Sequence, residues 1–139
     1  MPRPALTQRD LLRRRCASAL AHHRRRARAE GVTLAYGLEE LVHLAASVAC
    51  AYCYRPLGAD LTFDHGVPTS RPGGSWALAN LFAVCPRCNA LKGRLTRDEY
   101  RALCDFLDGI GPAAAEDLVR RLLAGGRAYR RSSHKRGKS

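Results

Sequence analysis

The chain has 139 residues, of which 46% are apolar, and 24 Lys and Arg against 12 Asp and Glu give it a formal net charge of +12 at pH 7. This length and composition predict one domain with a single core. We expect neither a membrane span nor a secretory signal, because no apolar stretch approaches roughly 18 residues and none near the start precedes a small-residue cleavage site. The six cysteines are too few to predict a secreted module held together by disulfides.

The positive charge is concentrated at the two ends of the chain. Residues 1–30 carry a net charge of +7, residues 31–110 a net charge of −1, and residues 111–139 a net charge of +6. Basic arms of this kind usually bind a polyanion, most often nucleic acid. For residues 131–139 a solvated, disordered tail is the alternative. We expect residues 1–30 to strengthen binding, and the central chemistry to remain detectable without them.

Two helices are predicted before the middle of the chain. Thr7 and Asp10 form a capping-box pattern that predicts a helix start, and Gly31 predicts its end. The partial apolar stripe of this helix comprises Leu11, Leu12, Cys16, Ala19, Leu20 and Ala27. A second helical pattern covers residues 38–48.

The middle of the chain changes character, and helices return after it. Two short β-prone runs, residues 61–64 and 81–84, are separated by glycine and proline turn signals. Thr96 and Glu99 form a second capping box, which predicts a helix that ends near Gly109. A last helix is predicted over residues 113–124, ending at two consecutive glycines.

Four of the six cysteines lie in two Cys-x-x-Cys pairs, Cys50 with Cys53 and Cys85 with Cys88. Two such pairs supply the four thiolates of a structural zinc site, which would join the ends of a segment with few large apolar residues. A redox-active pair is the alternative, but it requires only one Cys-x-x-Cys on a thioredoxin-like frame. Cys16 and Cys104 lie on apolar helix faces and are interpreted as small core residues.

A polar constellation lies between and just after the cysteine pairs. Asp64 and His65 are adjacent at the end of the first β-prone run, where Gly66 and Pro68 break the strand so that both side chains can serve one site. Asn89 directly follows Cys88 and is expected in the first turn of a helix that begins there. A carboxylate oxygen, an amide oxygen and a neutral imidazole suit Mg²⁺-assisted phosphodiester hydrolysis.

In these residues the sequence resembles the HNH endonuclease family, in the version with two Cys-x-x-Cys zinc knuckles that is common among bacterial and phage proteins. The resemblance covers residues 50–100, and it implies an α+β fold: a small zinc-stapled ββα-metal core flanked by N- and C-terminal helices. It implies that His65 is the general base, that Asp64 and Asn89 hold one Mg²⁺ or Mn²⁺, and that Asn80 orients His65. Asn89 stands where the family often has histidine, and it still offers an oxygen ligand.

The expected organisation is a basic helical extension over residues 1–49, a nuclease core over 50–108, a C-terminal helix over 109–130 and a disordered tail over 131–139. Taken singly, the Asp-His pair and the two asparagines would be read as turn or cap residues. Trp76 is interpreted as anchoring its loop to the core, with stacking on a base as the alternative. No chemistry is assigned to His22, His23, His43 or His134. The residues predicted to contact nucleic acid are Lys92, Arg13, Arg14, Arg24 and Arg25, with a solvated helix lysine as the alternative for the first.

The sequence therefore predicts a divalent-metal-dependent endonuclease that acts on double-stranded DNA. Two alternatives remain open: a zinc-dependent DNA-binding protein that does not cleave, and a packaging or recombination accessory that acts beside a larger partner such as a phage terminase. The expected location is the cytoplasm of a bacterial or phage-infected cell, in association with the nucleoid.

Overall fold

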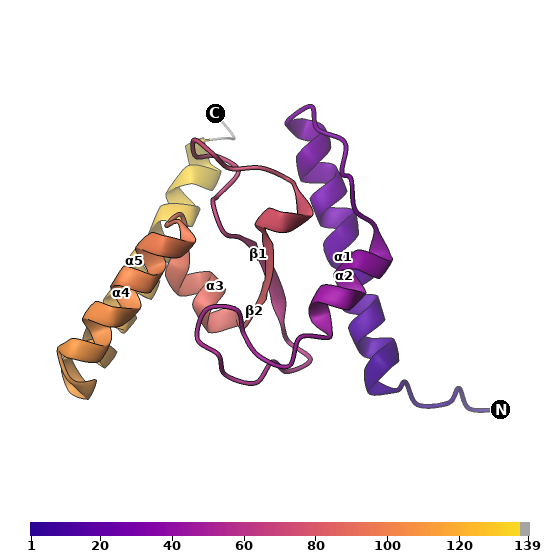
Figure 1. The fold of residues 1–139 in the computed structure, drawn as a ribbon, viewed down its shortest axis with the longest axis horizontal. Coiled ribbons are helices and arrows are strands. Elements are labelled where there is room, and N and C mark those ends of the chain that lie inside the picture. Colours follow the sequence, from indigo (N-terminus) through magenta and orange to yellow (C-terminus); the bar gives the residue numbers. More distant parts are fainter. Residues whose placement is uncertain (137–139) are drawn as a thin grey trace. The chain divides into compact units, whose positions relative to one another are not determined.

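The computed structural model describes residues 1–136 and confirms the predicted α+β class (Figure 1). The chain forms two compact units, Met1–Pro86 and a second unit that begins at Arg87. The first unit contains α1 (Gln8–Ala29), α2 (Leu38–Ala45), β1 (Thr62–His65), a short 3-10 turn (Leu78–Asn80) and β2 (Leu81–Val84). The second contains most of α3 (Pro86–Lys92), then α4 (Arg97–Gly109) and α5 (Pro112–Arg136). Within residues 1–136, no helix combines the length and apolarity that crossing a membrane requires.

Helix α1 begins at the predicted capping box. The Asp10 backbone N–H donates to Thr7 Oγ1 at 3.1 Å, and the Thr7 backbone N–H donates to Asp10 Oδ2 at 2.9 Å. One stripe of the helix is buried, at residues Cys16, Leu20, His23 and Ala27. This stripe differs from the predicted one in two respects, because Leu11 is exposed and the buried set includes a histidine.

The first unit has a core to which α1 contributes directly. α1 lies alongside α2 (Figure 1), and the buried cluster consists of Cys16, Leu20, Tyr36, Leu41, Ala45, Leu61 and Leu81. Residues 1–30 are therefore not a detachable arm, because removing them would expose the apolar faces of α2 and of both strands. α2 ends at Ala45 rather than at residue 48, since Ala49 pairs with Pro56 in a bridge that opens the first cysteine knuckle.

The two strands form an antiparallel pair that positions the ends of the central loop. His65 lies opposite Leu81 and Asp64 lies opposite Phe82, so the first strand is shifted by one residue from its prediction and the second matches it. The loop between them folds back on itself so closely that a Cβ atom at Gly74 would lie 2.0 Å from the backbone oxygen of Pro68. Only glycine fits at that position without moving the backbone.

The second unit is helical. α4 begins at the predicted capping box, in which the Thr96 N–H donates to Glu99 at 2.8 Å and the Glu99 N–H donates to Thr96 at 3.2 Å. α5 passes through Gly125 and Gly126, where its end was predicted, and continues to Arg136. A glycine inside a helix costs about 1 kcal/mol relative to alanine, which the alanine- and arginine-rich sequence on both sides tolerates. The predicted tail is therefore helical over residues 131–136, and residues 137–139 lie outside the described part of the chain.

Candidate metal centre and catalytic site

The four cysteines of the two pairs form one cluster. The sulfur atoms of Cys50, Cys53, Cys85 and Cys88 all lie within 4.8 Å of one another, and the Cys53 and Cys85 sulfurs are 3.9 Å apart. A tetrahedral zinc site with Zn–S bonds of about 2.3 Å has sulfurs about 3.8 Å apart. The cluster therefore fits Zn²⁺ in both donor type and spacing.

Backbone N–H groups donate hydrogen bonds to the Cys50 sulfur. The N–H of Tyr52 donates to this sulfur at 3.4 Å, and the N–H of Cys85 donates to it at 3.3 Å. Burial by itself would raise the pKa of Cys50, but the donated N–H groups of Cys53, Cys85 and Tyr52 outweigh it and lower the pKa to about 7. Because zinc binds the thiolate rather than the thiol, these hydrogen bonds favour the metal-binding form.

The sulfur of Cys88 has a partner on the next helix. Tyr100 of α4 is 3% exposed, and its side chain forms a hydrogen bond with Cys88. Burial and this hydrogen bond both raise the pKa of Tyr100, so its hydroxyl stays protonated and can donate to the sulfur. Cys104, which was predicted to be a core residue, is half-buried and also contacts Tyr100, whereas Cys16 is fully buried as predicted.

Asp64 is held by a residue of the first cysteine knuckle. The Tyr52 hydroxyl donates to Asp64 Oδ2 at 2.7 Å, which is a short hydrogen bond to a carboxylate. Tyr52 lies between Cys50 and Cys53, so the same four-residue turn supplies two sulfurs and a support for the predicted Mg²⁺ ligand. Tyr52 is not predictable as a site residue from the sequence, because its contact with Asp64 joins residues 12 positions apart.

His65 lies among aromatic and imidazole rings. It is 8% exposed, and the edge-on ring of Trp76 is 4.7 Å from its centroid. The ring of His23, from α1, is 5.9 Å away. Trp76 anchors the loop as predicted, since it is 6% exposed and its Nε1–H donates to Glu30 Oε2 at 2.5 Å. His23 was assigned no chemistry, although its spacing from Leu20 and Ala27 places it on the buried stripe of α1.

Asn80 holds the backbone of the loop that follows His65. Its side-chain oxygen accepts the Val67 N–H at 2.9 Å, and its side-chain nitrogen donates to the backbone oxygens of Val67 and Ser75, both at 2.9 Å. Its own backbone oxygen accepts the Gly66 N–H at 2.8 Å. Asn80 thus fixes the two residues that come directly after His65, so an orienting effect on His65 would act through the backbone.

The remaining predicted residues lie on helices. Asn89 and Lys92 are both on α3; Asn89 is half-buried, and α3 begins at Pro86 instead of after Cys88 as expected. Lys92 is only 1% exposed, which fits neither a phosphate contact nor a solvated lysine, so we leave it out of the nucleic-acid interface. Arg13 is half exposed and pairs with Glu39 at 2.6 Å.

Arg14, Arg24 and Arg25 are exposed on α1. At about 100° per residue, Arg14 and Arg25 lie on the side of the helix opposite its buried stripe, whereas Arg13 and Arg24 flank the stripe.

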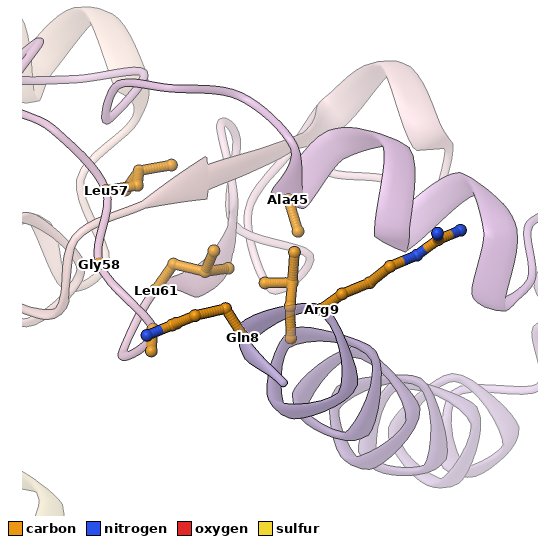
Figure 2. A pocket seen from close by; sticks show the side chains of 8 residues that line it. Gln8, Arg9, Ala45, Leu57, Gly58 and Leu61 are labelled. Atoms are coloured by element: carbon orange, nitrogen blue, oxygen red, sulfur yellow. The ribbon is translucent and has the colours of Figure 1, made fainter. Parts of the chain in front are cut away.

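A pocket of about 500 Å³ lies between the start of α1 and the segment before β1. Figure 2 shows the aliphatic side chains of Ala45, Leu57 and Leu61 along its walls and the longer side chains of Gln8 and Arg9 beside them. None of its lining residues belongs to the predicted catalytic set.

Comparison with models of known protein families matches residues 50–95 to the HNH endonuclease family. This segment contains all four cysteines of the cluster and the residues Asp64, His65, Asn80 and Asn89. The resemblance predicted from the sequence is thereby confirmed for this third of the chain. Searches among curated proteins and among solved structures each gave no significant match.

Proposed function

We propose that this chain is a divalent-metal-dependent endonuclease that hydrolyses phosphodiester bonds in DNA. The observation that carries the proposal is the placement of Asp64 and His65 within the HNH-matching segment. They are the last two residues of β1, and Asp64 is hydrogen-bonded to Tyr52 of the cysteine knuckle. The HNH match indicates nuclease activity on nucleic acid, and the roles given below to individual residues are our proposal.

His65 is the general base in this proposal. A neutral imidazole nitrogen of His65 accepts a proton from the attacking water, which makes the water a better nucleophile. Asn80 contributes by fixing the backbone of Gly66 and Val67, and with it the point at which the chain leaves His65.

Asp64 and Asn89 are the proposed ligands of Mg²⁺ or Mn²⁺. A carboxylate oxygen and an amide oxygen are hard donors of the type that Mg²⁺ prefers, so the residues fit the ion. When bound, the ion would stabilise the negative charge that develops on the phosphate and on the leaving oxygen. The cysteine cluster, with Zn²⁺, has a structural role in which the knuckle holds Tyr52 against Asp64.

The exposed arginines of α1 are the proposed contacts to duplex DNA. Arg14, Arg24 and Arg25 are exposed, and guanidinium groups bind phosphates with two parallel hydrogen bonds. Because each phosphate contact releases counterions, replacing these three residues by alanine should flatten the dependence of log affinity on log salt by about 0.9 for each lost contact. An unchanged slope in a gel-shift titration would exclude this face from the interface.

The deciding experiment follows the conversion of supercoiled plasmid to nicked or linear DNA, with Mg²⁺, Mn²⁺ or EDTA. We expect cleavage with either ion and none with EDTA. His65→Ala should cleave at least about 100-fold more slowly while binding DNA with near-normal affinity, because only the proton acceptor is lost. Asn89→Ala should need more Mg²⁺, and raising the ion concentration should partly restore it. Both variants keep every zinc ligand, and circular dichroism should show that they are folded.

A folded wild-type protein that binds the plasmid but cuts it with neither ion would favour a DNA-binding role without cleavage. A folded His65→Ala variant that cuts as fast as wild type would show that another group is the base.

A further inference from the structure

The environment of His65 includes residues outside the segment that matches the HNH family. His23 comes from α1, 27 residues before that segment begins, and its ring packs against His65, Trp76 and Phe63 with centroid separations of 5.9, 5.9 and 6.3 Å. Trp76 in turn contacts His65 at 4.7 Å with an interplanar angle of 78°. We call three rings the cage around His65: His23 and Trp76, which contact His65, and Phe63, which contacts His23.

The polar atoms of the cage have partners that hold the rings in place. The hydroxyl of Tyr36, which is 4% exposed, lies 3.0 Å from His23 Nδ1. The Nε1–H of Trp76 donates to Glu30, at the end of α1, and the Arg26 guanidinium lies 5.3 Å from the centre of the Trp76 ring. Both anchors are specific: a buried imidazole or indole N–H is stable only when its hydrogen-bonding groups are satisfied.

We propose that His23 and Trp76 are positioning residues for His65, and that α1, through His23, Arg26 and Glu30, is thereby part of the catalytic site. The inference rests on the proposed role of His65 as the base. His65 is the last residue of β1, and strand pairing before it and the hydrogen bonds from Gly66 and Val67 to Asn80 after it hold the backbone, but none of these contacts fixes the side-chain torsions of His65. The cage supplies the contacts that select one orientation of the imidazole.

Apolar packing alone does not require a histidine at position 23 or a tryptophan at position 76. A leucine at position 23 would continue the apolar stripe of α1 without needing Tyr36, and a phenylalanine at position 76 would fill the loop without needing Glu30. His23 and Trp76 instead carry polar ring nitrogens into a buried region, where each needs a hydrogen-bond partner, and both rings contact the His65 imidazole. Burial lowers the pKa of His23 to about 4, so this ring is neutral at pH 7 and does not repel the positive charge that His65 gains as a base.

Precise placement of a general base matters for the rate more than for substrate affinity. A displacement of about 1 Å in a reacting group can cost about 100-fold in rate. We therefore expect His23→Leu and Glu30→Ala to lower kcat for plasmid nicking by about 10- to 100-fold while KM changes by less than about threefold. Asp117→Ala is the matched control, because it likewise removes one carboxylate from a helix surface, here from α5, which supplies no residue of the cage; Asp117 pairs with Arg120 and Arg121 of its own helix.

A double-mutant comparison tests whether the effect passes through His65. Combined with His65→Ala, the change His23→Leu should have little further effect on the residual rate, since a positioning residue acts only through the group it positions. Equal fold-losses in the wild-type and His65→Ala backgrounds would overturn the proposal. So would a folded His23→Leu and a folded Glu30→Ala that both keep the wild-type kcat.

A second readout does not depend on cleavage. In protein with isotopically labelled histidine, the His65 ring should give one sharp set of NMR signals in wild type and in Asp117→Ala, and broadened or doubled signals in Glu30→Ala and His23→Leu. A single unchanged set in both cage variants would overturn the proposal even if the wild-type protein turned out not to cut DNA. If His23→Leu fails to fold, Glu30→Ala, a change at an exposed position, still decides both measurements.

Discussion

Acid should weaken the fold through His23, and the size of the effect follows from the position of this ring. The His23 side chain is 6% exposed and lies beside the Tyr36 hydroxyl. Burial, with smaller contributions from the nearby charges of His65, His22 and Arg26, lowers the pKa of His23 from 6.5 to about 4. The unfolded chain therefore binds a proton at this residue over the range from about pH 6.5 down to 4, where the folded chain does not.

The direction in which the free energy of unfolding changes with pH follows from this difference in bound protons. Since the unfolded state takes up more protons in this range, the free energy of unfolding falls as the pH falls from about 6.5 to 4. One pKa unit corresponds to about 1.4 kcal/mol, so the full effect is on the order of 3 kcal/mol. Between pH 7 and pH 5, where the unfolded imidazole becomes mostly protonated and the folded one stays neutral, His23 alone should remove about 2 kcal/mol.

The assay is urea unfolding of the zinc-loaded protein at pH 7 and at pH 5, followed by circular dichroism. The variant is His23→Gln, which keeps a hydrogen-bonding group near Tyr36 but does not titrate. The matched control is His22→Gln, at the exposed neighbouring position. Protonation of the cysteine ligands also destabilises the protein in acid, but it acts equally on all three proteins and cancels in the comparison.

We expect wild type and His22→Gln to lose about 2 kcal/mol more between the two pH values than His23→Gln does. If all three lose the same amount, His23 is not buried as a neutral imidazole, and the reasoning about its place beside His65 is wrong.

Three further predictions concern the supports of the site. Tyr52→Phe should raise the Mg²⁺ concentration for half-maximal cleavage by about 10- to 100-fold with zinc content unchanged, because Asp64 loses its hydrogen bond. The control Tyr54→Phe should change neither quantity, and an unaltered Mg²⁺ requirement in Tyr52→Phe would contradict a role for Tyr52 in holding Asp64. Cys85→Ser should lose stoichiometric zinc in elemental analysis and melt well below wild type, and full zinc would refute the four-thiolate site. Deletion of residues 1–30 should abolish the cooperative melt, because it removes part of the core; a wild-type melting curve would disprove this.

The features that were predictable from the sequence are those set by residues close together in the chain. Both capping boxes form as predicted, because a cap joins residues three positions apart. Strand β2 matches its prediction for a similar reason, since a short apolar run and flanking turn residues define it locally. The cysteine cluster was predictable over a longer distance because each Cys-x-x-Cys pair is a local turn, and a tetrahedral ion requires two such pairs.

The features that were not predictable depend on which segments pack together. No pattern in the sequence relates Tyr52 to Asp64 or His23 to His65, because these pairs form only when the strand end meets the knuckle or α1. The burial of Lys92 was not predictable either, because a lysine on a short helix is usually solvated and only the packing of other segments around it buries it. A weak signal existed for His23, whose spacing continues the stripe of Cys16, Leu20 and Ala27. Because histidine is not apolar, this spacing alone does not predict that the ring is buried.

The two proposed catalytic residues of β1 depend on different parts of the chain. Asp64 is held by Tyr52, whose position depends on the zinc knuckle, whereas His65 is held by rings anchored to α1. Loss of zinc and disturbance of α1 should therefore impair the site by different routes. The first should weaken binding of the divalent ion, and the second should slow proton transfer while the ion still binds. Because excess Mg²⁺ can offset a weakened ion site but cannot reorient an imidazole, it should partly rescue Tyr52→Phe and leave Glu30→Ala unchanged.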